Sequence, residues 1–101
     1  MTTKKPLFEL GQIVATPGVL EAIPNQIALL VLLSRHVRGN WGCVCADDAA
    51  ANDAAVTEGD RILSAFPINP NKVCADHGDN CVWIITEADR SVTTFLLPDE
   101  Y

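Results

Sequence analysis

The chain has 101 residues, 49% of them hydrophobic, so it can bury the core of one domain and is too apolar for a disordered chain. Thirteen Asp and Glu residues against seven Lys and Arg residues give a formal net charge of −6. Direct binding to nucleic acid is therefore not expected, because that affinity comes mainly from Lys and Arg replacing the counterions of phosphates.

The sequence shows neither a secretion signal nor a membrane span. Glu9 interrupts the apolar residues Leu7 and Phe8 at once, so no signal-peptide core follows the N-terminal lysines. The longest apolar run, 27–33, is far shorter than the ~20 residues of a spanning helix. We therefore expect a cytoplasmic protein without membrane association, in a reducing compartment where disulfides are disfavoured.

The N-terminal part predicts a strand and a short helix. Residues 7–15 have the composition of a short, irregular strand. Thr16 and Pro17 then indicate a helix start, because a hydroxyl side chain caps well and proline is favoured at the first helical position. That helix is brief, since Pro24 cannot continue it.

A second helix is predicted from Asn25, which can cap it, to Gly39, which can end it in a left-handed conformation. Arg35 and Arg38 lie in its last turn, where cations complement the helix dipole. Apolar residues cover most of its circumference as far as Ser34. This pattern predicts a largely buried helix.

A third helix is predicted to start near Asp47 or Asp48 and to end at Gly59. The two carboxylates suit the positive end of a helix. The many alanines between them and the glycine lose little side-chain entropy and allow a neighbour to approach closely.

The C-terminal part predicts strands. Residues 61–66, 82–87 and 92–97 alternate in hydrophobicity and are rich in β-branched and aromatic residues. The polar turn 88–91 joins the last two into an antiparallel hairpin. The longer loop 67–80 carries prolines, glycine and cysteines, and it separates the first of these strands from the hairpin.

This order predicts a single α+β domain over residues 1–101, with a short N-terminal strand, two to three helices and then a three-stranded antiparallel sheet. One face of such a sheet packs on the helices. The other face is expected to be partly solvated.

Four segments of the sequence resemble an uncharacterised family of small bacterial proteins carried by plasmids, integrative elements and phages. They are residues 8–18, 35–42, 84–91 and 96–101. The resemblance implies a role in the biology of a mobile genetic element, where small acidic proteins include inhibitors of host defence such as anti-CRISPR and anti-restriction proteins. It assigns no functional residue, and the loop 67–80 is longer and richer in cysteine than the family pattern.

The strongest local chemical signal is a set of zinc-type ligands on two predicted loops. Zinc takes four thiolate or imidazole ligands in structural sites. One alternative is that these cysteines are incidental thiols, and another is that Cys74 and Cys81 pair when oxidised. A zinc ion, if bound, would be structural, and no other cofactor is required. The candidate ligands are Cys43, Cys45, Cys74, His77 and Cys81.

A catalytic alternative centres on His36. Arginines beside a histidine lower its pKa and allow it to act as a general base. With Arg35, Arg61 and Thr94 it would resemble the site of a small, metal-independent ribonuclease-like toxin, in which arginine stabilises the phosphoryl transition state. The simpler alternative is that Arg35 and Arg38 complement the end of a helix and His36 lies beside them by chance.

The acidic residues provide the preferred hypothesis. An acidic helix can imitate nucleic-acid phosphates and occupy a basic groove of a protein partner, whereas the alternative is a solvated surface that aids solubility. We therefore expect no catalytic residue and a non-enzymatic accessory protein that binds and inhibits a host-defence or DNA-processing protein. A zinc-stabilised interaction module is the third hypothesis. The candidate contact residues are Asp47, Asp48, Asp53, Glu58, Asp60 and Tyr101.

Overall fold

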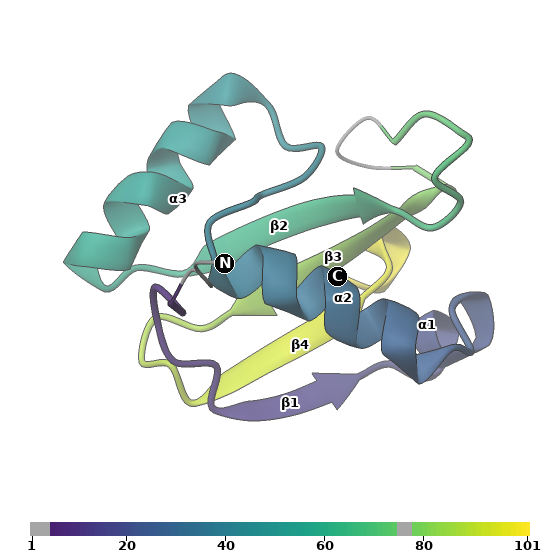
Figure 1. The fold of residues 1–101 in the computed structure, drawn as a ribbon, viewed down its shortest axis with the longest axis horizontal. Helices are drawn as coiled ribbons and strands as arrows, with labels where there is room; N and C mark the ends of the chain where they lie inside the picture. Colours follow the sequence, from purple (N-terminus) through teal and green to yellow (C-terminus); the bar gives the residue numbers. More distant parts are fainter. Residues whose placement is uncertain (1–4, 75–77) are drawn as a thin grey trace.

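The computed structural model describes residues 5–74 and 78–101, and it confirms the α+β fold with an N-terminal strand and three helices (Figure 1). The elements, in chain order, are β1 (Gln12–Ala15), α1 (Pro17–Ala22), α2 (Gln26–Val37), α3 (Ala46–Glu58), β2 (Ile62–Pro67), β3 (Cys81–Thr86), β4 (Val92–Leu96) and the 3-10 helix η1 (Pro98–Glu100).

The predicted helix starts are confirmed by capping hydrogen bonds. The Thr16 hydroxyl accepts from the N–H of Val19 at 3.3 Å, and Asn25 Oδ1 accepts from the N–H of Ile27 at 2.9 Å. Each cap satisfies a donor that the first turn of a helix leaves unpaired. None of the helices in the described part of the chain has the length and apolar character of a membrane span.

The sheet differs from the prediction in one strand. It is four-stranded and mixed, in the order β1-β4-β3-β2, with β2, β3 and β4 antiparallel as expected and β1 parallel to β4. Parallel strands need a long crossover, and here nearly the whole chain lies between the two. Local patterns could not reveal this pairing, because it joins residues about 80 positions apart.

β1 is also shorter than the predicted strand 7–15. Gly11, at φ +64°, turns the chain directly before Gln12, and a Cβ there would lie 2.3 Å from the carbonyl oxygen of Ser91. Only glycine fits this close approach without strain. The strand therefore begins only after the glycine.

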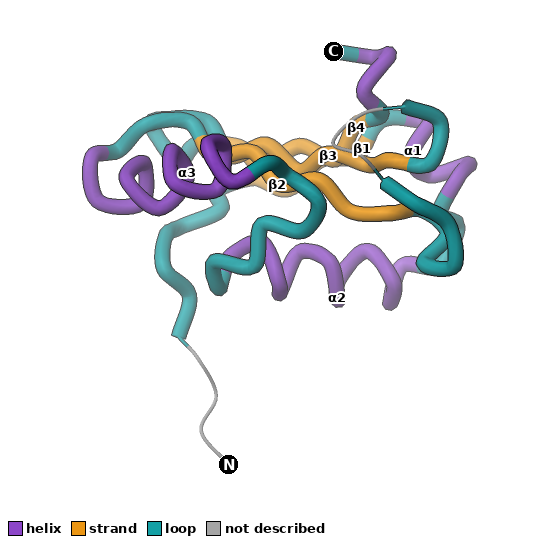
Figure 2. Tube along the Cα trace, turned by 90° about the horizontal axis from the view of Figure 1, so that it is seen from above, coloured by secondary structure: helices purple, strands orange, loops and turns teal. Residues whose placement is uncertain are grey.

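The sheet separates two unequal layers. Seen edge-on in Figure 2, α2 lies on one side, the C-terminal segment lies on the other, and α3 lies beside the β2 edge. The main core forms between α2 and the sheet. Its buried residues are Val19, Ile23, Leu29, Leu33, Phe66, Val82, Ile84 and Phe95.

The prediction that α2 is largely buried is wrong. The helix buries one side, with Leu29 and Leu33 against the sheet, but Ile27 is 71% exposed, Leu30 61% and Val31 54%. A single sheet covers only one side of a helix, and no helix or sheet among the described residues covers the other side (Figure 2). A stripe of apolar side chains, Ile27, Leu30 and Val31, therefore faces solvent.

The outer edge of β2 is closed by the chain itself. Asn52 of α3 donates to the carbonyl of Leu63 at 2.7 Å and accepts from its N–H at 3.1 Å. The segment 41–43 continues the contact, because Cys43 N–H donates to Ala65 and Ala65 N–H donates to Trp41. Pro67, the next outward position, has no N–H. This edge therefore offers no free donor to another strand.

The C-terminal segment covers part of the other sheet face. The ring of Tyr101 packs edge-on against Trp83, with centroids 5.6 Å apart. The Thr16 hydroxyl donates to the Glu100 carboxylate at 2.7 Å, and this bond, with that from Leu97 N–H, lowers the pKa of Glu100. Trp83 and Thr94 remain only half-buried on this face, as expected for a partly solvated face.

Candidate functional site

His36 is completely buried between α2 and the sheet. Its Nδ1 lies 2.5 Å from Ser64 Oγ of β2, and its Nε2 lies 2.9 Å from Thr86 Oγ1 of β3. Thr86 Oγ1 lies 2.8 Å from Thr93 Oγ1 of β4, which donates to the carbonyl of Leu10 at 2.7 Å. A chain of polar contacts thus connects β2 to the segment that leads into β1.

The directions of these hydrogen bonds follow from the last one. A carbonyl only accepts, so the single Thr93 proton goes to Leu10. Thr86 must then donate to Thr93, and it accepts from His36 Nε2–H. Burial disfavours a second proton on the ring, so Nδ1 accepts from the Ser64 hydroxyl. The imidazole is neutral, with its single proton on Nε2.

Burial lowers the pKa of His36 from 6.5 to about 3. The sequence-based explanation was different, since it assigned a lowered pKa to the neighbouring arginines. The rings of Phe8 and Trp41 pack edge-on against the imidazole at 5.3 and 6.0 Å, and they keep it out of water. A charged imidazole would lose its hydration there without gaining an ionic partner. His36 is a neutral core residue that a substrate cannot reach.

The other residues of the catalytic alternative lie elsewhere. Arg35 is exposed and places its guanidinium over the ring of Phe66, 4.8 Å from the centroid. Arg61 donates to the hydroxyl of Tyr101. Thr94 pairs with Ile85 and points to the sheet face opposite Thr93, because successive strand residues alternate. The structure therefore does not bring these groups around His36.

Two of the candidate zinc ligands lie side by side. Cys74 Sγ is 3.0 Å from Cys81 Sγ, which is at the start of β3. Cys43 and Cys45 lie in the loop before α3, and His77 lies outside the described residues. Within the described ranges, no three His, Cys, Asp or Glu side chains gather as a metal site. The zinc site remains a prediction, and so does the pairing of Cys74 with Cys81.

The acidic candidates are all exposed on α3 and the turn after it, but they do not form one patch. Asp47 and Glu58 lie on the same side of the helix, because eleven residues are close to three turns of 3.6 residues. These three turns separate the two carboxylates along the helix axis. Asp53 is on another side and accepts from Trp41 Nε1 at 2.9 Å. Tyr101, 67% exposed, lies on the sheet face that the C-terminal segment covers.

Most of the exposed large apolar side chains in the described residues lie on β1, α1 and α2. Besides the stripe of Ile27, Leu30 and Val31, Ile13 is 49% exposed and Leu20 48%. Soluble monomers rarely expose a continuous apolar patch of more than a few hundred Å², and larger ones mark interaction sites. The signal for this surface in the sequence is the all-round apolar character of α2, a pattern that by itself predicts burial.

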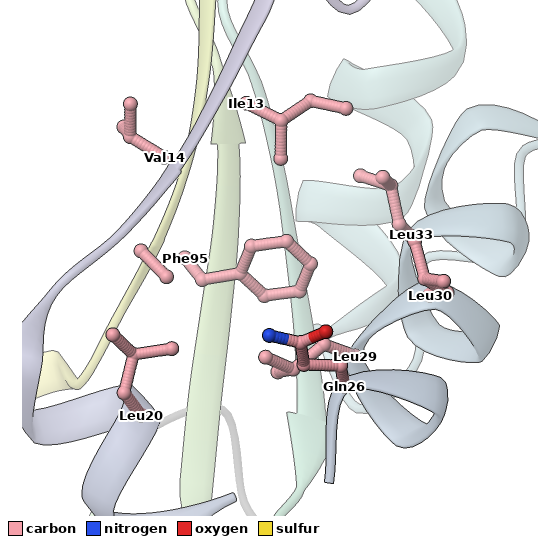
Figure 3. A pocket seen from close by; sticks show the side chains of 9 residues that line it. Ile13, Val14, Leu20, Gln26, Leu29, Leu30, Leu33 and Phe95 are labelled. Carbon is pink, nitrogen blue, oxygen red and sulfur yellow. The ribbon is translucent and has the colours of Figure 1, made fainter. Parts of the chain in front are cut away.

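A groove between α2 and the edge strand β1 belongs to this surface (Figure 3). Ile13 points from β1 toward α2, and Phe95 of β4 forms the floor. Of the described residues in the lining, Gln26 alone has a polar side chain and none is charged. The lining residues are Ile13, Val14, Ala15, Leu20, Gln26, Leu29, Leu30, Leu33 and Phe95.

Comparison with known proteins adds no relative to this description: no family model, no curated protein and no solved structure matches the chain. Its function must be inferred from its own residues.

Two structural roles were missed at the level of sequence. Asn52 closes the β2 edge. Its position in the middle of an alanine-rich helix could have indicated such a role, because asparagine is a poor helix former. Arg90, at φ +60°, donates to the carbonyls of Ala55 and Asp60 and so ties the hairpin turn to the end of α3. Both side chains serve the backbone of another element.

Proposed function

We propose that this chain is a non-enzymatic accessory protein of a mobile genetic element that acts by binding a protein partner. The observation that carries the proposal is the stripe of Ile27, Leu30 and Val31, which the isolated chain leaves in water. Burying a large aliphatic side chain completely contributes about 1.5–3 kcal/mol, so covering this stripe would supply a substantial part of a binding free energy.

The acidic residues fit the same role. With a net charge of −6, the chain attracts a basic protein surface over a longer range than the apolar stripe can act. Such charges mainly raise the association rate and the selectivity. We assign to Asp47, Asp48 and Asp53, all exposed on α3, this steering role, and to the α2 stripe most of the contact energy.

The kind of partner follows from the resemblance to proteins of plasmids, integrative elements and phages. A small acidic binder in that setting acts on a host-defence or DNA-processing protein, and occupying its nucleic-acid site inhibits it, as anti-CRISPR and anti-restriction proteins do. The buried, neutral His36 supports binding over the ribonuclease-like alternative, because its ring nitrogens are both occupied within the core.

Quantitative capture from a native host lysate tests the proposal. The double variant Ile27→Ser, Val31→Ser should retain at least ten-fold less of one dominant partner than the unmodified chain. The matched control is Val73→Ser, which changes a more exposed β-branched residue outside α2 and should leave capture unchanged.

Charge reversal of Asp47, Asp48 and Asp53 to lysine should weaken capture several-fold, and less so at high salt. Two results would overturn the proposal: retention of the same partner by both variants, or turnover of RNA by the pure chain in EDTA.

A further inference from the structure

The edge of the sheet formed by β1 is open. Gln12 N–H donates to Ser91 and Thr16 N–H to Phe95, so positions 12, 14 and 16 direct their backbone groups toward β4. Ile13 and Ala15 direct theirs outward. In the part of the chain that the structure describes, nothing hydrogen-bonds to these outward groups. Such an edge is a template for another strand.

The surface beside this edge is neutral, although the chain is strongly acidic. Among the residues that the structure describes, no charged side chain lines the groove between β1 and α2, and Ile13 and Leu20 are each about half exposed beside it. An acidic lining would repel a second copy of an acidic chain. A neutral, apolar lining is instead complementary to itself in charge.

We infer that two copies of this chain join through their β1 edges in a symmetric, antiparallel pair. The two-fold axis passes between the two copies of Val14. Ile13 of each copy then lies opposite Ala15 of the other, and the two pairs exchange four backbone hydrogen bonds. The two sheets become one sheet of eight strands. The two α2 helices lie on the same face of it, because rotation about an axis perpendicular to a sheet does not exchange the two faces of the sheet.

The register follows from the positions that face outward. A slip of one residue would present groups that already bond to β4, and it would turn every side chain to the wrong face. A slip of two residues, with Ile13 opposite its own copy, would leave Ala15 without a partner in the other β1 strand and halve the number of bonds. The pairing of Ile13 with Ala15 uses every outward group of β1.

The area available fits a moderately stable dimer. The half-exposed apolar side chains Ile13, Val14 and Leu20 form, with the four backbone hydrogen bonds, a small contact, for which we take a total buried area of about 1,200 Å². This is the lower limit of a standard protein–protein interface. We expect a dissociation constant on the order of 1–100 μM, and a dimer that salt strengthens because both copies are acidic.

Sedimentation of the full chain from about 1 to 500 μM tests the dimer, together with amide hydrogen exchange. The average mass should rise toward that of two chains over this range, and the amides of Ile13 and Ala15 should become protected in proportion to the dimer. The amides of Gln12 and Val14 are bonded to β4 in either state, so they serve as internal references.

Two variants distinguish dimerisation through this interface from non-specific association. Ala15→Pro removes an outward N–H without removing a bond to β4, and Ile13→Lys places a charge in the neutral groove. Each should weaken dimerisation at least ten-fold while the monomer keeps its helical and sheet signals. Val73→Lys, at an exposed loop position, should not.

A chain that stays monomeric at 500 μM, with rapid exchange at both amides, would overturn the inference. So would a dimer that persists in both variants. Protection of these amides only when a protein partner is added would assign the edge to a strand of that partner instead of a second copy.

Discussion

The two edges of this sheet are built in opposite ways. At β2, Asn52 imitates a neighbouring strand by bonding both backbone groups of Leu63, and the segment 41–43 does the same for Ala65. At β1, the outward groups of Ile13 and Ala15 have no hydrogen-bond partner among the described residues, and they lie beside an apolar groove. The comparison shows that, within the described ranges, side-chain and backbone groups of this chain occupy the outward hydrogen-bonding groups of one edge strand, β2, and leave those of the other, β1, exposed. The open edge is therefore the place where we expect another chain.

The largest expected effect concerns His36, whose polar contacts run from β2 to the segment before β1. Its pKa is about 3 in the folded chain and 6.5 without burial, so between these values the unfolded chain binds a proton that the folded chain does not. Stability is complete above pH 6.5 and falls as the pH drops toward 3, by up to about 5 kcal/mol.

Urea unfolding at pH 7, 5 and 4 measures this loss. His36→Gln, which cannot titrate, should be less stable at pH 7 but show a smaller decrease on acidification. In the unmodified protein, nitrogen chemical shifts of the ring should report a neutral imidazole protonated on Nε2 at pH 5. An imidazole that titrates near 6.5 in the folded protein would contradict the prediction.

Opening the β2 edge should have the next largest effect. Asn52→Ala removes both bonds to Leu63, and leaving two such backbone groups unpaired under α3 costs roughly 3 kcal/mol. Leu63→Pro, which removes the N–H on the other side of the contact, should cost at least as much. Thermal unfolding measures both. Thr57→Ala, exposed on the same helix, should change stability by less than about 0.5 kcal/mol.

Substitution of two glycines separates the effect of the close contact with β2 on stability from the effect of backbone strain. Gly42 and Gly59 both have positive φ, at +74° and +80°, but a Cβ at Gly42 would lie 1.9 Å from the carbonyl oxygen of Ala65, whereas nothing lies within 4 Å at Gly59. Gly59→Ala should therefore cost about 1 kcal/mol, from conformation alone. Gly42→Ala should cost roughly 3 kcal/mol, because the segment must also move away from the edge. Equal losses would show that the close approach does not matter.

The smallest effect is expected at the open edge. Ala15→Pro removes an N–H that bonds to none of the residues in the described ranges, so the stability of the dilute monomer should change by less than about 1 kcal/mol. Chemical denaturation at about 0.1 μM, below the expected dissociation constant, measures it. A loss as large as that of Leu63→Pro would mean that the β1 edge is already paired within the monomer.

Local chemistry was sufficient to predict most elements of this fold. Thr16 and Asn25 cap helices because their side-chain oxygens reach backbone N–H groups two or three residues away. Gly59 ends α3 in the left-handed conformation, and the turn after Glu87 joins β3 to β4 as an antiparallel hairpin. Each of these features depends on neighbours in the chain.

The candidate site was less predictable, because it depends on contacts between distant residues. The composition of α2 is that of a buried helix, and only the arrangement of layers shows that the chain provides one sheet to cover it. Likewise His36 has the same neighbours in sequence whether it is catalytic or buried. Ser64 and Thr86, 28 and 50 residues away, determine that it is a neutral part of the core.

The amino-acid order alone was enough to establish an acidic α+β domain, its helix boundaries and its C-terminal hairpin, since these follow from composition and from interactions within a few residues. The tertiary structure was needed to show that β1 lies parallel to β4, that one sheet edge is closed and the other open, and that α2 exposes Ile27, Leu30 and Val31. These properties arise where segments far apart in the chain meet, and no local pattern encodes which segments do so.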